Sequence, residues 1–173
     1  MALCATMSKS QVRAMAEENK ATIVVFSGDM DKVFAAFIIA TGCAAAGMDT
    51  TLFFTFWGLN AIKTGAPIKA QSFLGKMMGL VNRGGIQRLN PSRFSFGGIG
   101  RGLFHKMMSD KNVTSLDDLR QTLVDLDVHL LACKMSMDVL EISRDDLIPE
   151  VENVVGVATF VKEAADSKIQ LFI

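Results

Sequence analysis

The fold is decided by residues 21–56, which read ATIVVFSGDMDKVFAAFIIATGCAAAGMDTTLFFTF. The first six residues are apolar or β-branched, and with Ser27 they predict a parallel strand over residues 21–27 that is buried on both faces. The uncharged, Ala-rich run that follows ends at Gly47 and predicts a crossover helix over residues 30–46, capped by Asp29 or Asp31. A second strand is predicted over residues 49–56. Two parallel strands joined by a helix form a right-handed unit, so the sequence predicts an α/β fold.

The same alternation of helix and strand resumes after residue 113. A helix that begins after Thr114 or Ser115 precedes a predicted strand over residues 128–132, which ends at Cys133. A short helix over residues 135–140, a helix over 156–165 and a terminal strand over 168–173 complete the pattern. We therefore expect a single α/β domain over residues 21–173 with a mostly parallel sheet, preceded by an N-terminal tail over residues 1–20.

Residues 63–109 interrupt this rhythm with poor periodicity, nine glycines and two Met pairs. They contain no acidic residue and eight basic ones: Lys63, Lys69, Lys76, Arg83, Arg88, Arg93, Arg101 and Lys106. Long structureless segments are rare inside compact domains, so we interpret this stretch as a long Gly/Met-rich basic insertion with a role in function or oligomer formation. It would attract an anionic ligand, an acidic partner or a membrane surface, or else be neutralised by acids elsewhere in the fold or in a neighbouring subunit.

Composition excludes several classes of protein. The 18 basic and 18 acidic residues leave zero net charge, so nothing global indicates a nucleic-acid partner. Three unpaired cysteines and two histidines predict neither a disulfide framework nor a metal site. The uncharged run over residues 33–48 is short for a membrane span and fits a buried helix better, so membrane contact is not expected. These features favour a reducing, cytoplasmic setting.

The ends of three predicted strands gather the candidate site residues. In open parallel sheets, ligands and reactive groups lie beyond the carboxyl ends of the strands. If the three strands are neighbours, one crevice is lined by the following candidates: Ser27, Gly28 and Asp29 after the first strand, Trp57 and Gly58 after the second, and Cys133, Lys134 and Met135 after the third.

Cys133 has the most favourable chemical setting of these candidates. It follows a strand and precedes a predicted helix, so helix N-terminal amides and the adjacent Lys134 would stabilise a thiolate. The alternative is that Cys133 is a small buried core residue. Cys43 lies on the small-residue side of the first helix, which favours core packing, and Cys4 lies in the tail. The glycine-rich stretch 97-GGIGRG-102 lacks the GxGxxG spacing and a Walker lysine, so we predict no nucleotide cofactor.

Three stretches together resemble the DsrE/DsrF/DrsH-like family: VVFSGDMDKVFAAFIIATGCAAAGM, TLFFTFWGLNAIK and LLACKMSMDVLEI. The resemblance extends over about residues 20–173 and implies a flavodoxin-like or Rossmann-like three-layer domain that assembles into a homo-oligomer. It also implies sulfur relay, in which a cysteine accepts sulfane sulfur as a persulfide and passes it to a partner carrier protein. The family cysteine falls on Cys133, and the SGD turn falls on residues 27–29.

The sequence thus predicts a sulfur-relay protein with Cys133 as the nucleophile and no cofactor. Its partners would be a sulfane-sulfur donor and a small sulfur-carrier protein, and it could turn over as a sulfurtransferase. Two alternatives remain open at this stage. One is a non-catalytic oligomeric scaffold, and the other is a peroxiredoxin-like thiol–disulfide oxidoreductase that uses Cys133 with Cys4.

Overall fold

The core of the protein is a five-stranded sheet in which every pair of neighbouring strands is parallel. The computed structural model describes residues 19–66, 77, 79, 84–93 and 95–173. The strands are β1 (Lys20–Val25), β2 (Asp49–Phe54), β3 (His129–Cys133), β4 (Asn153–Val155) and β5 (Ser167–Phe172), in the order β4-β3-β2-β1-β5. The predicted parallel sheet is confirmed, and β1, β2 and β3 are direct neighbours within it.

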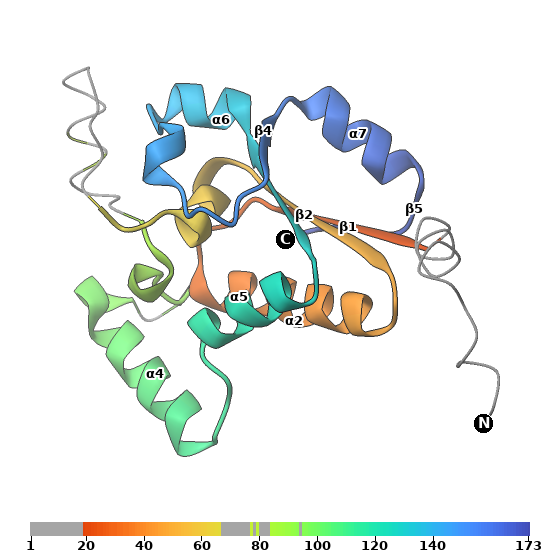
Figure 1. Ribbon diagram of the computed structural model, residues 1–173. Helices are drawn as coiled ribbons and strands as arrows, with labels where there is room; N and C mark the ends of the chain where they lie inside the picture. Colours follow the sequence, from red (N-terminus) through yellow and green to blue (C-terminus); the bar gives the residue numbers. More distant parts are fainter. Residues whose placement is uncertain (1–18, 67–76, 78, 80–83, 94) are drawn as a thin grey trace, which may run out of the picture.

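Helices cover both faces of the sheet and make three layers (Figure 1). On one face lie α2 (Met30–Ala45) and α5 (Leu116–Asp125), and on the other lie α6 (Lys134–Val139) and α7 (Val157–Ala165). The larger apolar core lies on the α2 side, where Phe37 of α2 packs edge-on against Phe54 of β2. The α7 side holds a smaller cluster, in which Phe160 stacks on Phe53 at 4.8 Å between ring centroids.

The long apolar helix α2 connects β1 to β2, as the sequence predicts for a crossover helix. It begins after Asp29, which occupies the N-cap position without a capping hydrogen bond from its side chain. Its buried residues, which include Val33, Ala36 and Ala40, follow the helical period and contact the sheet. Among the residues that the structure describes, no helix combines the length and the apolar character needed to cross a bilayer.

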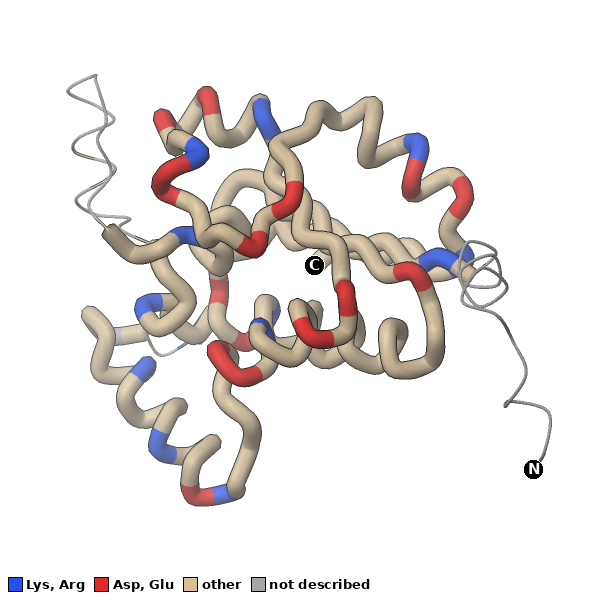
Figure 2. The backbone as a smooth tube through the Cα atoms, in the orientation of Figure 1, with Lys and Arg blue, Asp and Glu red and all other residues tan. Residues whose placement is uncertain are grey.

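The basic segment 63–109 lies at the carboxyl edge of the sheet, where its described parts are mostly helical. The 3-10 helix η1 (Phe56–Ile62) leads into it, and η2 (Ile86–Arg88), η3 (Phe96–Gly98) and α4 (Ile99–Asp110) follow. Figure 2 shows that Lys and Arg recur along α4 and the loop before it. Residues 67–76 and 80–83 of this segment, and nearly all of the tail with Cys4, lie outside the described residues. That the segment is an insertion stays a prediction.

Candidate functional site

The carboxyl ends of β1 and β2 pack against each other through two glycines. Gly58 donates its backbone N–H to the carbonyl of Phe26 at 2.8 Å, and a Cβ at Gly58 would lie 1.9 Å from the carbonyl oxygen of Val25. A Cβ at Gly28 would lie 2.6 Å from the carbonyl oxygen of Trp57. The two predicted turn glycines therefore allow the first two strand ends to approach closely, and their backbones fill the space between them.

Cys133 lies at the end of β3, where it is also the N-cap residue of α6. Its thiol is free, and only 3% of the residue is exposed. The side chain belongs to the small cluster on the α7 side of the sheet, together with Val24, Phe53 and Leu131. The thiol thus lies at the edge of the smaller core, and it is held in place by the strand and by the start of the helix.

Polar donors also act on the sulfur of Cys133. Burial alone would raise the pKa of the thiol, but the hydroxyl and backbone N–H of Ser136, the hydroxyl of Thr55 and the backbone N–H of Met135 lower it. Together they hold the pKa of Cys133 below the usual value for cysteine. The two backbone N–H groups lie at the start of α6, where Cys133 is the N-cap residue, and hydrogen bonding from them lowers the pKa of the thiol. Such an environment favours the thiolate, which is the nucleophilic form of cysteine.

A hydroxyl pair connects the second strand end to this thiol. The Oγ1 of Thr55 and the Oγ of Ser136 lie 2.8 Å apart in a hydrogen bond, and both residues are buried. The sequence analysis missed both residues. A weak signal was present, because Ser136 stands three residues after an N-cap position and Thr55 interrupts an apolar run at its end.

The other predicted site residues lie around this centre, and of these Met135 contributes its backbone N–H to the Cys133 thiol. The Oγ of Ser27 accepts a hydrogen bond from the backbone N–H of Asp29 at 3.1 Å, and the Asp29 carboxylate pairs with Lys32 at 2.8 Å. Lys134 forms an exposed ion pair with Asp138, while Met135 is 54% exposed. A tryptophan that follows a strand is more often buried in the core, whereas Trp57 is 41% exposed. The contacts of Cys133 therefore run to Thr55, directly after β2, and to α6. The backbone N–H of Ser27 instead donates to the carbonyl of Ile173 at 3.2 Å, which ties the end of β1 to the last residue of the sequence.

The family model described as DsrE/DsrF/DrsH-like matches residues 17–172. The chain belongs to this family. One relative, "Uncharacterized protein YrkE" of Bacillus subtilis, is 38% identical over 162 residues, which cover 92% of this chain and all of that protein. A second, "Sulfur carrier protein DsrE2" of Allochromatium vinosum, is 29% identical over 161 residues, which cover 91% of this chain and 99% of that one.

The fold of this DsrE-family chain is also that of a solved structure, the E. coli protein ychN. The two superpose with a TM-score of 0.50, over 90% of this chain and 99% of ychN, at 13% identity. The resemblance stated from the sequence is thus confirmed at the level of family and fold, and family membership suggests sulfur relay.

Proposed function

We propose that this protein is a sulfur-relay protein in which Cys133 accepts sulfane sulfur as a persulfide and passes it to a partner carrier protein. One observation carries the proposal, namely the polar environment that lowers the pKa of this thiol at the end of β3. Family membership and a relative named as a sulfur carrier are consistent with it. The same donors that favour a thiolate would also stabilise the terminal sulfur of a persulfide anion.

The proposed reaction is two successive displacements at sulfur. The Cys133 thiolate attacks the sulfane sulfur of a donor persulfide, the donor S–S bond breaks, and the donor leaves as a thiolate with the electron pair. A thiolate of the acceptor then attacks the outer sulfur of Cys133, and the Cys133 thiolate is released. No net oxidation or reduction occurs, so the relay needs no cofactor.

Intact-mass spectrometry after incubation with polysulfide tests this proposal. We expect the added mass of one or more sulfur atoms on the wild-type chain and none on Cys133→Ala. Cys43→Ala is the matched control, because Cys43 is a buried thiol in α2 whose pKa is raised by burial. Equal uptake by Cys133→Ala and the wild type would refute the role of Cys133, and a disulfide on Cys133 in place of added sulfur would indicate an oxidoreductase.

We also propose that the protein works as a homo-oligomer in the reducing cytoplasm, where a relay thiol stays reduced. The support is an exposed apolar surface on α7 and β5, made by Val157, Val161 and Phe172. Three large exposed apolar side chains on neighbouring elements are typical of an interface. Light scattering should give a mass of several chains for the wild type and a smaller mass for Val161→Glu. A wild-type mass of one chain would refute the oligomer.

A further inference from the structure

The chain leaves β2 through a residue in a backbone conformation that its side chain does not favour. Phe56, directly after Thr55, has a φ of +44°, in the left-handed region. Four non-glycine residues in the described part of the chain have a positive φ, and the other three are Asn112, Asp127 and Glu141. Asn and Asp visit this region readily, whereas a bulky aromatic residue there has a strained backbone. Such strain persists only where surrounding contacts hold it, and it is concentrated at functional sites.

Hydrogen bonds to the end of β1 fix the backbone on both sides of Phe56. The N–H of Thr55 donates to the carbonyl of Val25 at 3.0 Å, and the N–H of Gly58 donates to the carbonyl of Phe26 at 2.8 Å. Thr55 itself is extended, with φ −135° and ψ 154°. The chain must therefore turn from an extended strand end into η1 between two fixed points, and Phe56 is the residue that takes up the turn.

The ring of Phe56 makes a contact that offsets this strain. Its centroid lies 5.5 Å from that of the Phe26 ring, at an interplanar angle of 51°. Phe26 also stacks on Phe172 of β5 at 5.6 Å between centroids. Aromatic pairs at such separations attract each other beyond the effect of the area that they bury. Phe26 and Phe172 are 37% and 71% exposed, and none of the three rings belongs to the two buried clusters, so replacing one leaves no cavity in the core.

The turn at Phe56 determines where the Thr55 hydroxyl lies. Oγ1 of Thr55 lies 2.8 Å from Oγ of Ser136, and both hydroxyls lower the pKa of the Cys133 thiol. A β-branched threonine has few rotamers about χ1, so the position of its hydroxyl follows the backbone closely. If the backbone at Phe56 relaxed out of the left-handed region, the end of β2 would rotate and move this hydroxyl away from Ser136.

From this geometry, we propose that Phe56 is a positioning residue for Cys133. Its left-handed backbone places the Thr55 hydroxyl against Ser136 and the thiol, and the contact of its ring with Phe26 holds that backbone in place. Phe56 thus acts on the thiol through Thr55. The inference rests on the proposed function only for the role of Cys133 as the relay thiol.

The rate of iodoacetamide alkylation of Cys133 as a function of pH tests this role with a matched pair, Phe56→Ala and Phe56→Gly. Cys4 and Cys43 are replaced by Ala throughout, so that Cys133 is the only thiol. Both variants remove the ring, but alanine disfavours the left-handed region, whereas glycine adopts it without strain. Phe56→Ala should move the midpoint to higher pH by about half a unit, which is roughly a threefold loss of thiolate near neutral pH. Phe56→Gly should keep the midpoint close to that of the wild type.

Two further variants test the path from Phe56 to the thiol. Phe56→Ala combined with Thr55→Val should have the midpoint of Thr55→Val alone, because the effect of Phe56 passes through the Thr55 hydroxyl. Phe26→Leu should raise the midpoint in the wild-type chain and leave it unchanged in Phe56→Gly, since a glycine needs no ring contact to hold its backbone. Phe26→Leu also keeps the test valid if Phe56→Ala does not fold.

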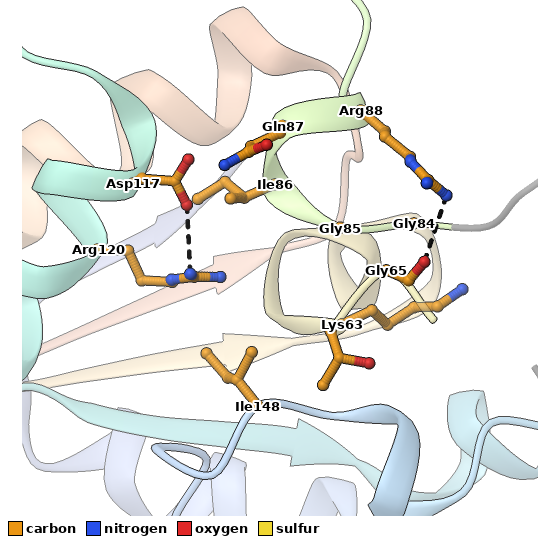
Figure 3. Close-up of a pocket in the computed structure, with 11 residues that line it drawn as sticks. Lys63, Gly65, Gly84, Gly85, Ile86, Gln87, Arg88, Asp117, Arg120 and Ile148 are labelled. Atoms are coloured by element: carbon orange, nitrogen blue, oxygen red, sulfur yellow. Dashed lines mark hydrogen bonds and ion pairs between the residues drawn. The ribbon is translucent and has the colours of Figure 1, made fainter. Parts of the chain in front are cut away.

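The control for backbone strain in general is Gly65→Ala. Gly65 also lies in the left-handed region, with φ +81°, and a Cβ there would lie 3.6 Å from the carbonyl oxygen of Gly84, which is an ordinary contact. Figure 3 shows Gly65 in the wall of a cavity of about 260 Å³, where its carbonyl accepts a hydrogen bond from Arg88 at 3.3 Å. The described walls of this cavity contain none of the residues around Cys133. Gly65→Ala should therefore introduce strain and leave the midpoint unchanged.

Equal midpoints for Phe56→Ala and Phe56→Gly, or an equal shift in Gly65→Ala and Phe56→Ala, would overturn the proposal. A shift from Phe56→Ala that adds in full to that of Thr55→Val would do the same. The relay is judged by sulfur uptake, and the positioning role by titration of the thiol with no sulfur donor present. Expected midpoints without sulfur uptake would therefore refute the relay alone, and sulfur uptake with equal midpoints would refute the positioning role alone.

Discussion

At Cys133, burial and polar contacts act on the pKa of the thiol in opposite directions. Burial raises the pKa, and the groups of Ser136, Thr55 and Met135 lower it further than burial raises it. Removing one of the hydroxyls takes away a group that lowers the pKa, so the pKa of the Cys133 thiol should rise. We expect Ser136→Ala to raise it more than Thr55→Val, because the Ser136 hydroxyl lowers the pKa more than the Thr55 hydroxyl does, and the backbone N–H of residue 136 stays in both variants. The rate of iodoacetamide alkylation as a function of pH, with Cys43 replaced by Ala in every variant, measures this change.

The control for these variants is Thr50→Val, at the amino end of β2. Thr50 is also a buried threonine, and its hydroxyl donates to the carbonyl of Met48 at 3.0 Å, at the end of the strand opposite Cys133. Its replacement should leave the alkylation profile unchanged. If neither Ser136→Ala nor Thr55→Val moves the midpoint of the alkylation-rate profile to higher pH, the hydroxyls do not stabilise the Cys133 thiolate.

Among the secondary-structure elements, η1 depends on the absence of a side chain at Gly58. The Cβ of an alanine there would lie 1.9 Å from the carbonyl oxygen of Val25, which is a backbone atom of a central strand and cannot move aside cheaply. Gly58→Ala should lower the free energy of unfolding by about 3 kcal/mol or more. Gly42→Ala, in an exposed turn of α2 with nothing within 4 Å, should instead raise it by about 0.5–1 kcal/mol. Urea unfolding of both variants measures these effects, and similar free energies for the two would contradict the close approach of β1 and η1.

Helix α5 depends on Ser115 for its N-terminus. The Oγ of Ser115 accepts a hydrogen bond from the backbone N–H of Asp118 at 3.1 Å and donates one to the Asp118 carboxylate at 2.7 Å. Ser115→Ala should cost about 1 kcal/mol of stability in urea unfolding. Thr114→Ala is the matched control, because Thr114 is exposed and precedes the N-cap residue, and its effect should be close to zero. An equal cost for both variants would show that the cap does not stabilise the helix.

The sequence predicts helices and strands well where a single hydrophobic pattern defines them. The two strands predicted over residues 21–27 and 49–56 and the helix predicted over 30–46 are confirmed as elements, because long apolar runs bounded by glycine leave few alternatives, although each strand ends two residues earlier than predicted. Helix α4 was missed because Gly100 and Gly102 lower helix propensity in its first turns. Strand β4 was missed because three residues are too few to show a period. The location of Cys133 at a strand end could be predicted, but its contacts with Thr55 and Ser136 require knowledge of which strands are neighbours.

For the whole molecule, the two sides of the sheet differ in how completely they are covered. Among the residues that the structure describes, the α2 and α5 side holds the large core, while the buried cluster on the α7 side has four members, one of them Cys133. The proposed oligomer surface of α7 and β5 lies on this thinly covered side. A partner that docks there would thus approach the side of the sheet on which the Cys133 thiol is packed.

The amino edge of the sheet joins three strands through one imidazole. Nε2 of His129 in β3 lies 3.1 Å from Asp49 of β2, and Nδ1 lies 2.7 Å from Glu152, next to β4. Burial would lower the pKa of this histidine, but hydrogen bonds and charge from Glu152 and Asp49 raise it above its ordinary value of 6.5. A neutral imidazole has one N–H and could donate to only one of the two carboxylates, whereas the charged form donates to both.

The stability from this contact should therefore depend on pH in a defined direction. Because the pKa is raised in the folded protein, the stabilisation is fully present below the unfolded pKa of about 6.5 and is lost as the pH rises through the folded value. His129→Gln should thus lower the free energy of unfolding more at pH 6 than at pH 8.5, and by less than about 1 kcal/mol because the ring is partly solvated. Urea unfolding at the two pH values measures the difference, with His105→Gln, exposed on α4, as the control. An equal loss for His129→Gln at both pH values would mean that the charged imidazole does not hold β2, β3 and β4 together at their amino ends.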